Sequence, residues 1–74
     1  MIPLSTIMNL ERLCVERKDI VITALSTYTQ EQLEDTRNEL VTFRDEKNKV
    51  RYLQVFNCID EILEDRTIEE INLQ

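Results

Sequence analysis

Glycine is missing from this sequence, and proline occurs once, at position 3. Tight hairpins and phosphate-binding loops normally require glycine, because glycine adopts a positive φ angle at no steric cost. The dinucleotide-binding fingerprint, the P-loop and the nucleophile elbow all contain glycine at fixed positions. The sequence therefore excludes these three kinds of loop and argues against β-sheets joined by tight turns.

Histidine is also missing, and the only cysteines are Cys14 and Cys58. Without a base that titrates near neutral pH, no thiol or hydroxyl has a partner that would activate it. The thiols lack the spacing of a metal site, so we interpret them as small buried hydrophobic residues, and a reducing cytosol disfavours a disulfide between them. Glu61, Glu64 and Asp65 lack the further oxygen ligands of a calcium or magnesium site. We expect no cofactor and no enzymatic activity.

Long hydrophobic runs are absent as well. The first ten residues, MIPLSTIMNL, contain neither a basic region nor a continuous apolar segment. This pattern predicts no signal peptide and no membrane-spanning helix. We expect a cytoplasmic protein, in the host cytoplasm if the chain is encoded by a virus.

Negative charge dominates the composition. The 74 residues include nine basic and 15 acidic ones, for a net charge of −6. This balance argues against affinity for nucleic acids or anionic membranes and favours a basic protein partner. A chain of this length forms a single domain over residues 1–74 and buries only about 60% of its unfolded surface, so association would complete its core.

A first helix is predicted over residues 5–26, with Ser5 and Thr6 at its start. Its main apolar face follows three- and four-residue steps and contains Ile7, Leu10, Cys14, Val21, Leu25 and Tyr28. Met8, Val15 and Ile22 form a second strip, about 120 to 160° away around the helix. Arg17 lies inside the main face and must reach either water or a carboxylate. We predict that this strip and Arg17 form a protein interface, within a homodimer or with another partner.

A second helix is predicted over residues 30–46. Thr29 and Gln32 form a Thr-x-x-Gln capping box at its start. Its apolar face contains Leu33, Thr36, Leu40 and Phe43.

A third helix is predicted over residues 49–65, with a broad apolar face that contains Tyr52, Leu53, Val55, Phe56, Ile59, Ile62 and Leu63. The faces of the second and third helices differ by about 130° on one straight helix, so we expect a junction between them, capped by Asp45 or Asn48. One continuous helix over 30–65 is the alternative, supported by an Asp45–Lys49 pair. The tail, residues 66–74, begins with a second capping box, Thr67 with Glu70, and forms a short helix or a frayed end.

These elements predict an all-α fold, an antiparallel helical hairpin or a three-helix arrangement that completes its core by dimerisation. The leading functional hypothesis is a small acidic regulator or inhibitor without enzymatic activity that binds a protein target through helices. Its candidate acidic face comprises Asp60, Glu61, Glu64 and Asp65. The alternative is a regulator that binds nucleic acid through a basic patch of Arg44, Lys47, Lys49 and Arg51.

Overall fold

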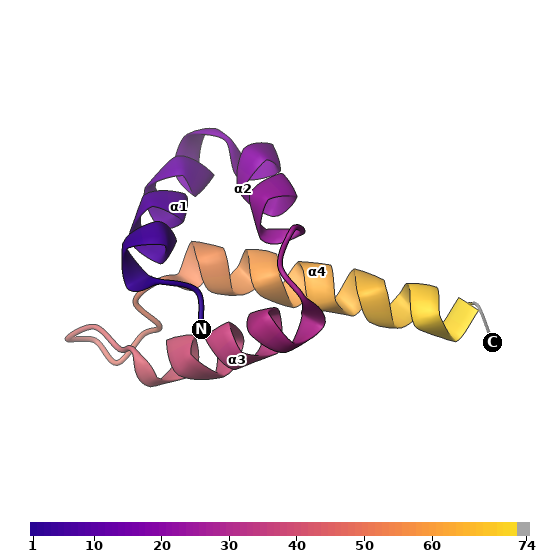
Figure 1. Cartoon of the computed structure of the whole chain (residues 1–74). Coiled ribbons are helices and arrows are strands. Elements are labelled where there is room, and N and C mark those ends of the chain that lie inside the picture. Colours follow the sequence, from indigo (N-terminus) through magenta and orange to yellow (C-terminus); the bar gives the residue numbers. More distant parts are fainter. Residues whose placement is uncertain (73–74) are drawn as a thin grey trace.

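The computed structural model describes residues 1–72 and contains four helices. They are α1 (Leu4–Glu16), α2 (Lys18–Leu25), α3 (Gln30–Thr42) and α4 (Leu53–Asn72). α1 and α2 lie on one side of α4 and α3 lies on the other, so each of the three packs against α4 (Figure 1). The all-α class is confirmed, with four helices in place of two or three, and dimerisation stays a prediction.

The single helix predicted over 5–26 is wrong, because the chain breaks at Arg17. This residue has φ −138° and ψ 71°, so it ends α1 and precedes α2. The break turns Arg17 out of the apolar face, and its Nη2 lies 3.2 Å from Oδ2 of Asp19. The hydrogen bond from Arg17 holds the pKa of Asp19 below its ordinary value.

α3 begins at the predicted capping box but ends before residue 46. The Thr29 hydroxyl accepts the Gln32 N–H at 3.1 Å, and the Gln32 side chain accepts the Thr29 N–H at 3.0 Å. Phe43 leaves the helix with φ −85° and ψ 112°. Its ring packs edge-on against Tyr52, with centroids 6.2 Å apart. The aromatic pair therefore closes the base of the loop that follows.

Residues 43–52 form a tight hairpin loop, although the lack of glycine in the sequence argues against one. Arg44 and Val50 form an isolated antiparallel bridge, and Asn48 takes the positive φ, 63°. Asparagine tolerates this conformation better than most residues. The Asp45 carboxylate accepts the backbone N–H groups of Lys47 and Lys49, both at 2.9 Å. Neither Asp45 nor Asn48 caps a helix, and the continuous helix over 30–65 is wrong too.

α4 is longer than predicted at its C-terminal end. It starts at Leu53 instead of residue 49 and continues through most of the predicted tail to Asn72. The Thr67 hydroxyl donates to the Leu63 carbonyl at 3.0 Å, the bond of a threonine inside a helix, so Thr67 does not start a new one. Residues 73 and 74 lie outside the described residues. Within residues 1–72 no helix is long and apolar enough to cross a bilayer.

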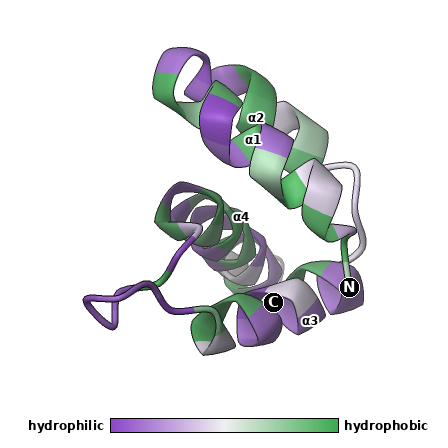
Figure 2. Ribbon diagram, turned by 90° about the vertical axis from the view of Figure 1, so that its left-hand side faces the viewer, coloured by the Kyte–Doolittle hydropathy of each residue, from purple (hydrophilic) through white to green (hydrophobic). Residues whose placement is uncertain are grey.

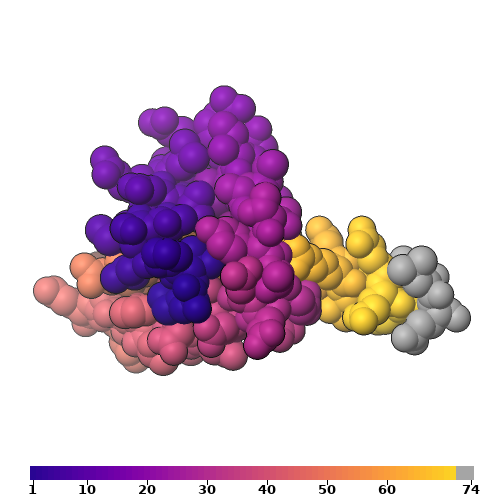
Figure 3. Space-filling model, in the orientation of Figure 1, coloured from indigo at the N-terminus to yellow at the C-terminus, as the bar shows by residue number. Residues whose placement is uncertain are grey.

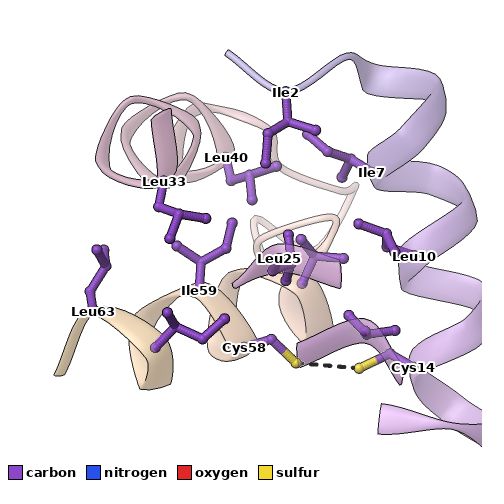
Figure 4. Close-up of a cluster of buried hydrophobic side chains, with 13 residues drawn as sticks. Ile2, Ile7, Leu10, Cys14, Leu25, Leu33, Leu40, Cys58, Ile59 and Leu63 are labelled. Carbon is purple, nitrogen blue, oxygen red and sulfur yellow. Dashed lines mark hydrogen bonds between the residues drawn. The ribbon is translucent and has the colours of Figure 1, made fainter. Parts of the chain in front are cut away.

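The core lies where the helices face α4 (Figure 4). Its fully buried members include Ile7, Val21, Leu25, Leu33, Leu40, Val55 and Ile59. Among residues 1–71, Thr36 is the one polar residue that is buried. Its hydroxyl accepts the Ile2 N–H at 3.0 Å and donates to the Gln32 carbonyl at 2.8 Å. Figure 2 shows the contrast between this interior and the hydrophilic loop 43–52 that projects from it.

Two side chains cap helices that are distant in the sequence. The Glu11 carboxylate on α1 accepts the N–H groups of Gln54 and Val55, at 3.3 and 3.0 Å, in the first turn of α4. Arg66 on α4 donates to the carbonyls of Ser26 and Tyr28 after α2, both at 3.1 Å. These bonds satisfy backbone groups at helix ends and tie both N-terminal helices to α4.

Replacing Glu11 by alanine should lower the free energy of unfolding by about 1–2 kcal/mol, because two N–H groups lose a charged acceptor. Urea denaturation followed by far-UV circular dichroism measures the change. Glu16→Ala, on the exposed surface of the same helix, is the control and should change stability by less than about 0.5 kcal/mol. Equal losses in the two variants would show that Glu11 does not cap α4.

Candidate protein-binding surface

An open groove with a volume of about 530 Å³ runs between α3 and α4. Four residues of α3 line it, Gln30, Glu34, Arg37 and Asn38. The residues from α4 are Asp60, Leu63, Glu64, Thr67 and Ile68. Both sets follow the three- and four-residue steps of one helix face. The span from 60 to 68 rises about 12 Å, which matches about two turns of a further helix.

The groove carries more negative than positive charge. Glu34, Asp60 and Glu64 supply carboxylates, and Arg37 is its one cation. Arg37 Nε lies 2.9 Å from Oδ1 of Asp60, although its N–H is not aligned for a hydrogen bond. The guanidinium also lies 5.6 Å from the ring centroid of Phe56. Within residues 1–72, no lysine or arginine forms an ion pair with Glu34 or Glu64.

The end of α4 projects beyond α2 and α3, as the ribbon and the space-filling view both show (Figures 1 and 3). We call residues 67–72 the overhang, and its first two residues, Thr67 and Ile68, also line the end of the groove. It exposes 53% of Ile68 and 65% of Ile71. Ile71 falls about 20° from Asp60 around the helix, so it extends the groove face of α4. Apolar surface therefore continues from the groove onto the overhang, flanked by Glu69 and Glu70.

The four residues of the predicted acidic face do not lie together in the structure. Asp60 and Glu64 line the groove. Glu61 instead lies on the side of α2, where its Oε2 is 3.3 Å from Lys18 Nζ. The hydrogen bond that Lys18 donates to this carboxylate raises the pKa of Lys18. Asp65 is exposed and is not among the groove residues. Sequence reasoning missed Glu34 and Ile68 as groove residues, because their position depends on how α3 packs against α4.

The predicted interface strip is also divided, by the break at Arg17. Met8 and Val15 are on α1, where 48% and 80% of these residues are exposed. Ile22 is on α2 and packs against the core. Arg17 is exposed beside Asp19. The three apolar residues therefore do not form one continuous strip, and their use in a homodimer stays a prediction.

The four residues of the predicted basic patch lie together on the loop 43–52. Arg44, Lys47, Lys49 and Arg51 are all exposed. Arg44 Nη1 donates to the Asn48 carbonyl at 3.4 Å, and the Arg51 guanidinium lies 6.0 Å from the centroid of the Tyr52 ring. The loop lies at the start of α4, and the overhang is the other end of the same helix. The bases of the loop and the acids of the overhang therefore lie at opposite ends of the elongated molecule (Figure 1).

Among residues 1–72, no group of three or more cysteine, aspartate or glutamate side chains is arranged to hold a metal ion. The groove offers binding chemistry, because the carboxylates of Glu34 and Glu64, which form no ion pair within these residues, lie on the same groove as the exposed side chain of Ile68. Comparisons with family models, with curated proteins and with solved structures gave no match.

Proposed function

We propose that the protein is a small regulator or inhibitor without enzymatic activity, and that its groove binds a basic amphipathic helix of a partner protein. One observation carries the proposal: Glu34 and Glu64, which form no ion pair within residues 1–72, border a groove whose apolar surface continues to the exposed Ile68 and Ile71. Exposed apolar surface beside polar residues is typical of interaction sites.

A helix fits this surface better than an extended strand. The groove lies between two helices that present side chains at three- and four-residue steps, and a third helix can pack its own ridges between them. Aliphatic residues of the partner would contact Leu63, Ile68 and Ile71. Lysine or arginine residues on its flanks would meet Glu34 and Glu64, which favours fast and specific association.

Titration of the labelled protein with a model peptide tests the proposal. The probe is a helical peptide of leucine and lysine, with leucine at three- and four-residue steps, and amide NMR shifts report where it binds. We expect the shifts to concentrate at residues 30–38 and 60–71 and the affinity to fall as salt is added. A peptide of the same composition in scrambled order should bind more weakly, because it has no continuous apolar face.

Charge-reversal variants distinguish binding in the groove from general electrostatic attraction between the acidic protein and the basic peptide. Glu64→Lys should weaken binding of the peptide about tenfold, the effect of roughly 1.4 kcal/mol. Glu39→Lys makes the same charge change on the opposite side of α3 and should have a much smaller effect, because Glu39 is exposed and does not line the groove. Equal weakening by both variants, or shifts away from the groove, would refute the proposed site.

Nucleic-acid binding is the second candidate, and the separation of charge along the molecule favours it. The exposed bases of the loop 43–52 lie far from the acidic overhang, with Tyr52 beside Arg51 as a surface for stacking. Four bases make a small footprint on an acidic chain, which keeps this candidate second. A single-stranded oligonucleotide that shifted only residues 44–52 in the same NMR experiment would favour it over the groove.

A further inference from the structure

The two cysteines, 44 positions apart in the sequence, face each other in the core. Cys14 is on α1 and Cys58 is on α4, and their sulfur atoms are 3.5 Å apart (Figure 4). Both thiols are free. Cysteines on different helices meet in this way only when the helices are packed as in the folded state, so the arrangement belongs to the tertiary structure and not to local sequence.

We propose that Cys14 and Cys58 are an oxidation site, at which a small disulfide such as oxidised glutathione converts the two thiols to a disulfide that ties α1 to α4. The proposal does not depend on what the groove binds. A disulfide requires sulfur atoms about 2.05 Å apart, so the thiols must approach by about 1.5 Å. Side-chain rotation and a small shift of α1 against α4 supply such a movement.

The reaction proceeds by two thiol–disulfide exchanges. In the first, the Cys14 thiolate attacks one sulfur of oxidised glutathione, forms a mixed disulfide and releases one glutathione thiolate. In the second, the Cys58 thiolate attacks Cys14 Sγ and releases the second glutathione. The protein loses two electrons and two protons, and one oxidised glutathione becomes two reduced molecules, so atoms and electrons balance.

Exposure decides which thiol reacts first. Cys14 is 7% exposed and Cys58 is 1% exposed, so an oxidant in solution reaches Cys14 more readily. Burial also raises the pKa of the Cys58 thiol to about 12, which leaves little of its nucleophilic thiolate near neutral pH. Cys58 therefore acts as the resolving thiol, protected until Cys14 carries the mixed disulfide.

The residues around Cys14 and Cys58 show which contacts between α1 and α4 the disulfide would reinforce. Cys14 lies three residues before the break at Arg17, and Lys18 on the next helix forms an ion pair with Glu61, which follows Cys58 by three residues on α4. In the reduced protein this part of α1 is attached to α4 by non-covalent contacts alone. The disulfide would close a long loop of chain and so restrict the unfolded state.

The test is incubation of the folded protein with mixtures of reduced and oxidised glutathione, followed by alkylation of free thiols and mass spectrometry. We expect a monomer that has lost two hydrogen atoms and carries neither label nor glutathione. Its thermal midpoint should be at least about 10 °C above that of the reduced protein, and dithiothreitol should reverse the shift.

Single serine variants check the order of the steps. Cys58→Ser should accumulate glutathione on Cys14 at least about tenfold faster than Cys14→Ser accumulates it on Cys58. The glutathione experiment on the unmodified protein needs no variant, so its result remains valid even if either serine variant folds poorly. Two free thiols persisting in the folded protein, in a mixture that oxidises the urea-unfolded chain, would overturn the proposal. So would an intermolecular disulfide, or a lower thermal midpoint after oxidation.

Discussion

Replacing Ile59 by alanine is expected to lower the free energy of unfolding by about 3–4 kcal/mol, because the change leaves a cavity at a fully packed position. Ile59 is completely buried near the middle of α4, the helix on which the others pack. Domains of this size have a total stability of about 4–11 kcal/mol, so the loss is a large share of it. The thermal midpoint, followed by far-UV circular dichroism, should fall by about 15 °C.

Ile68→Ala provides the matched control for this experiment. It makes the same chemical change on the same helix, but Ile68 is 53% exposed. Its effect on stability should stay below about 1 kcal/mol, because little surface is uncovered and no cavity forms. If the two variants lost the same stability, the packing of α4 described above would be incorrect.

Proline at position 17 should destabilise the protein by about 3 kcal/mol or more, although Arg17 is an exposed residue. Proline requires a φ near −65°, whereas the chain has −138° there. It would also remove the N–H that donates to the Leu13 carbonyl at 2.7 Å. Urea denaturation measures the loss, and Arg17→Ala separates it from loss of the Asp19 ion pair.

Lys18→Pro distinguishes a true break from a continuous helix. Lys18 is the first residue of α2, where proline fits because the N–H needs no partner within the helix. Arg17 before it already lies outside the helical region, as a residue before proline should. We expect Lys18→Pro to shift the unfolding midpoint far less than Arg17→Pro. Similar large losses at both positions would indicate one helix across residues 5–26.

Much of the fold could be predicted from local sequence patterns. The capping box of Thr29 and Gln32 fixed the start of α3, because both of its hydrogen bonds form within four residues. The three- and four-residue steps identified core positions such as Leu25, Leu40 and Ile59. Such patterns depend on the period of a helix and need no knowledge of the neighbouring elements.

Features that depend on particular backbone angles or distant contacts could not be predicted in this way. No glycine or proline marks the break at Arg17, and the apolar spacing continues across it. The hairpin loop uses Asn48 where glycine is usual. Glu11 caps a helix that starts 42 residues later in the chain, and nothing near Glu11 in the sequence signals that role.

The candidate site also has one part that the sequence predicts and one part that depends on packing. The run of acids from Asp60 to Asp65 was visible in the sequence as a possible binding face. The groove was not, because it requires Glu34 on α3 to lie beside Glu64 on α4, and that register is set by packing. The same packing placed Glu61 beside Lys18 instead.

The position of α4 has a consequence for how the protein acquires its structure during translation. Residues 1–42 include the first three helices, but Val21, Leu25, Leu33 and Leu40 are buried in a core that α4 completes. While these residues leave the ribosome, their apolar side chains have no α4 to cover them. The core can therefore form only after the buried residues of α4, the last of which is Leu63, have emerged. A pause that left only residues 1–42 outside the ribosome would expose an apolar nascent segment to chaperones.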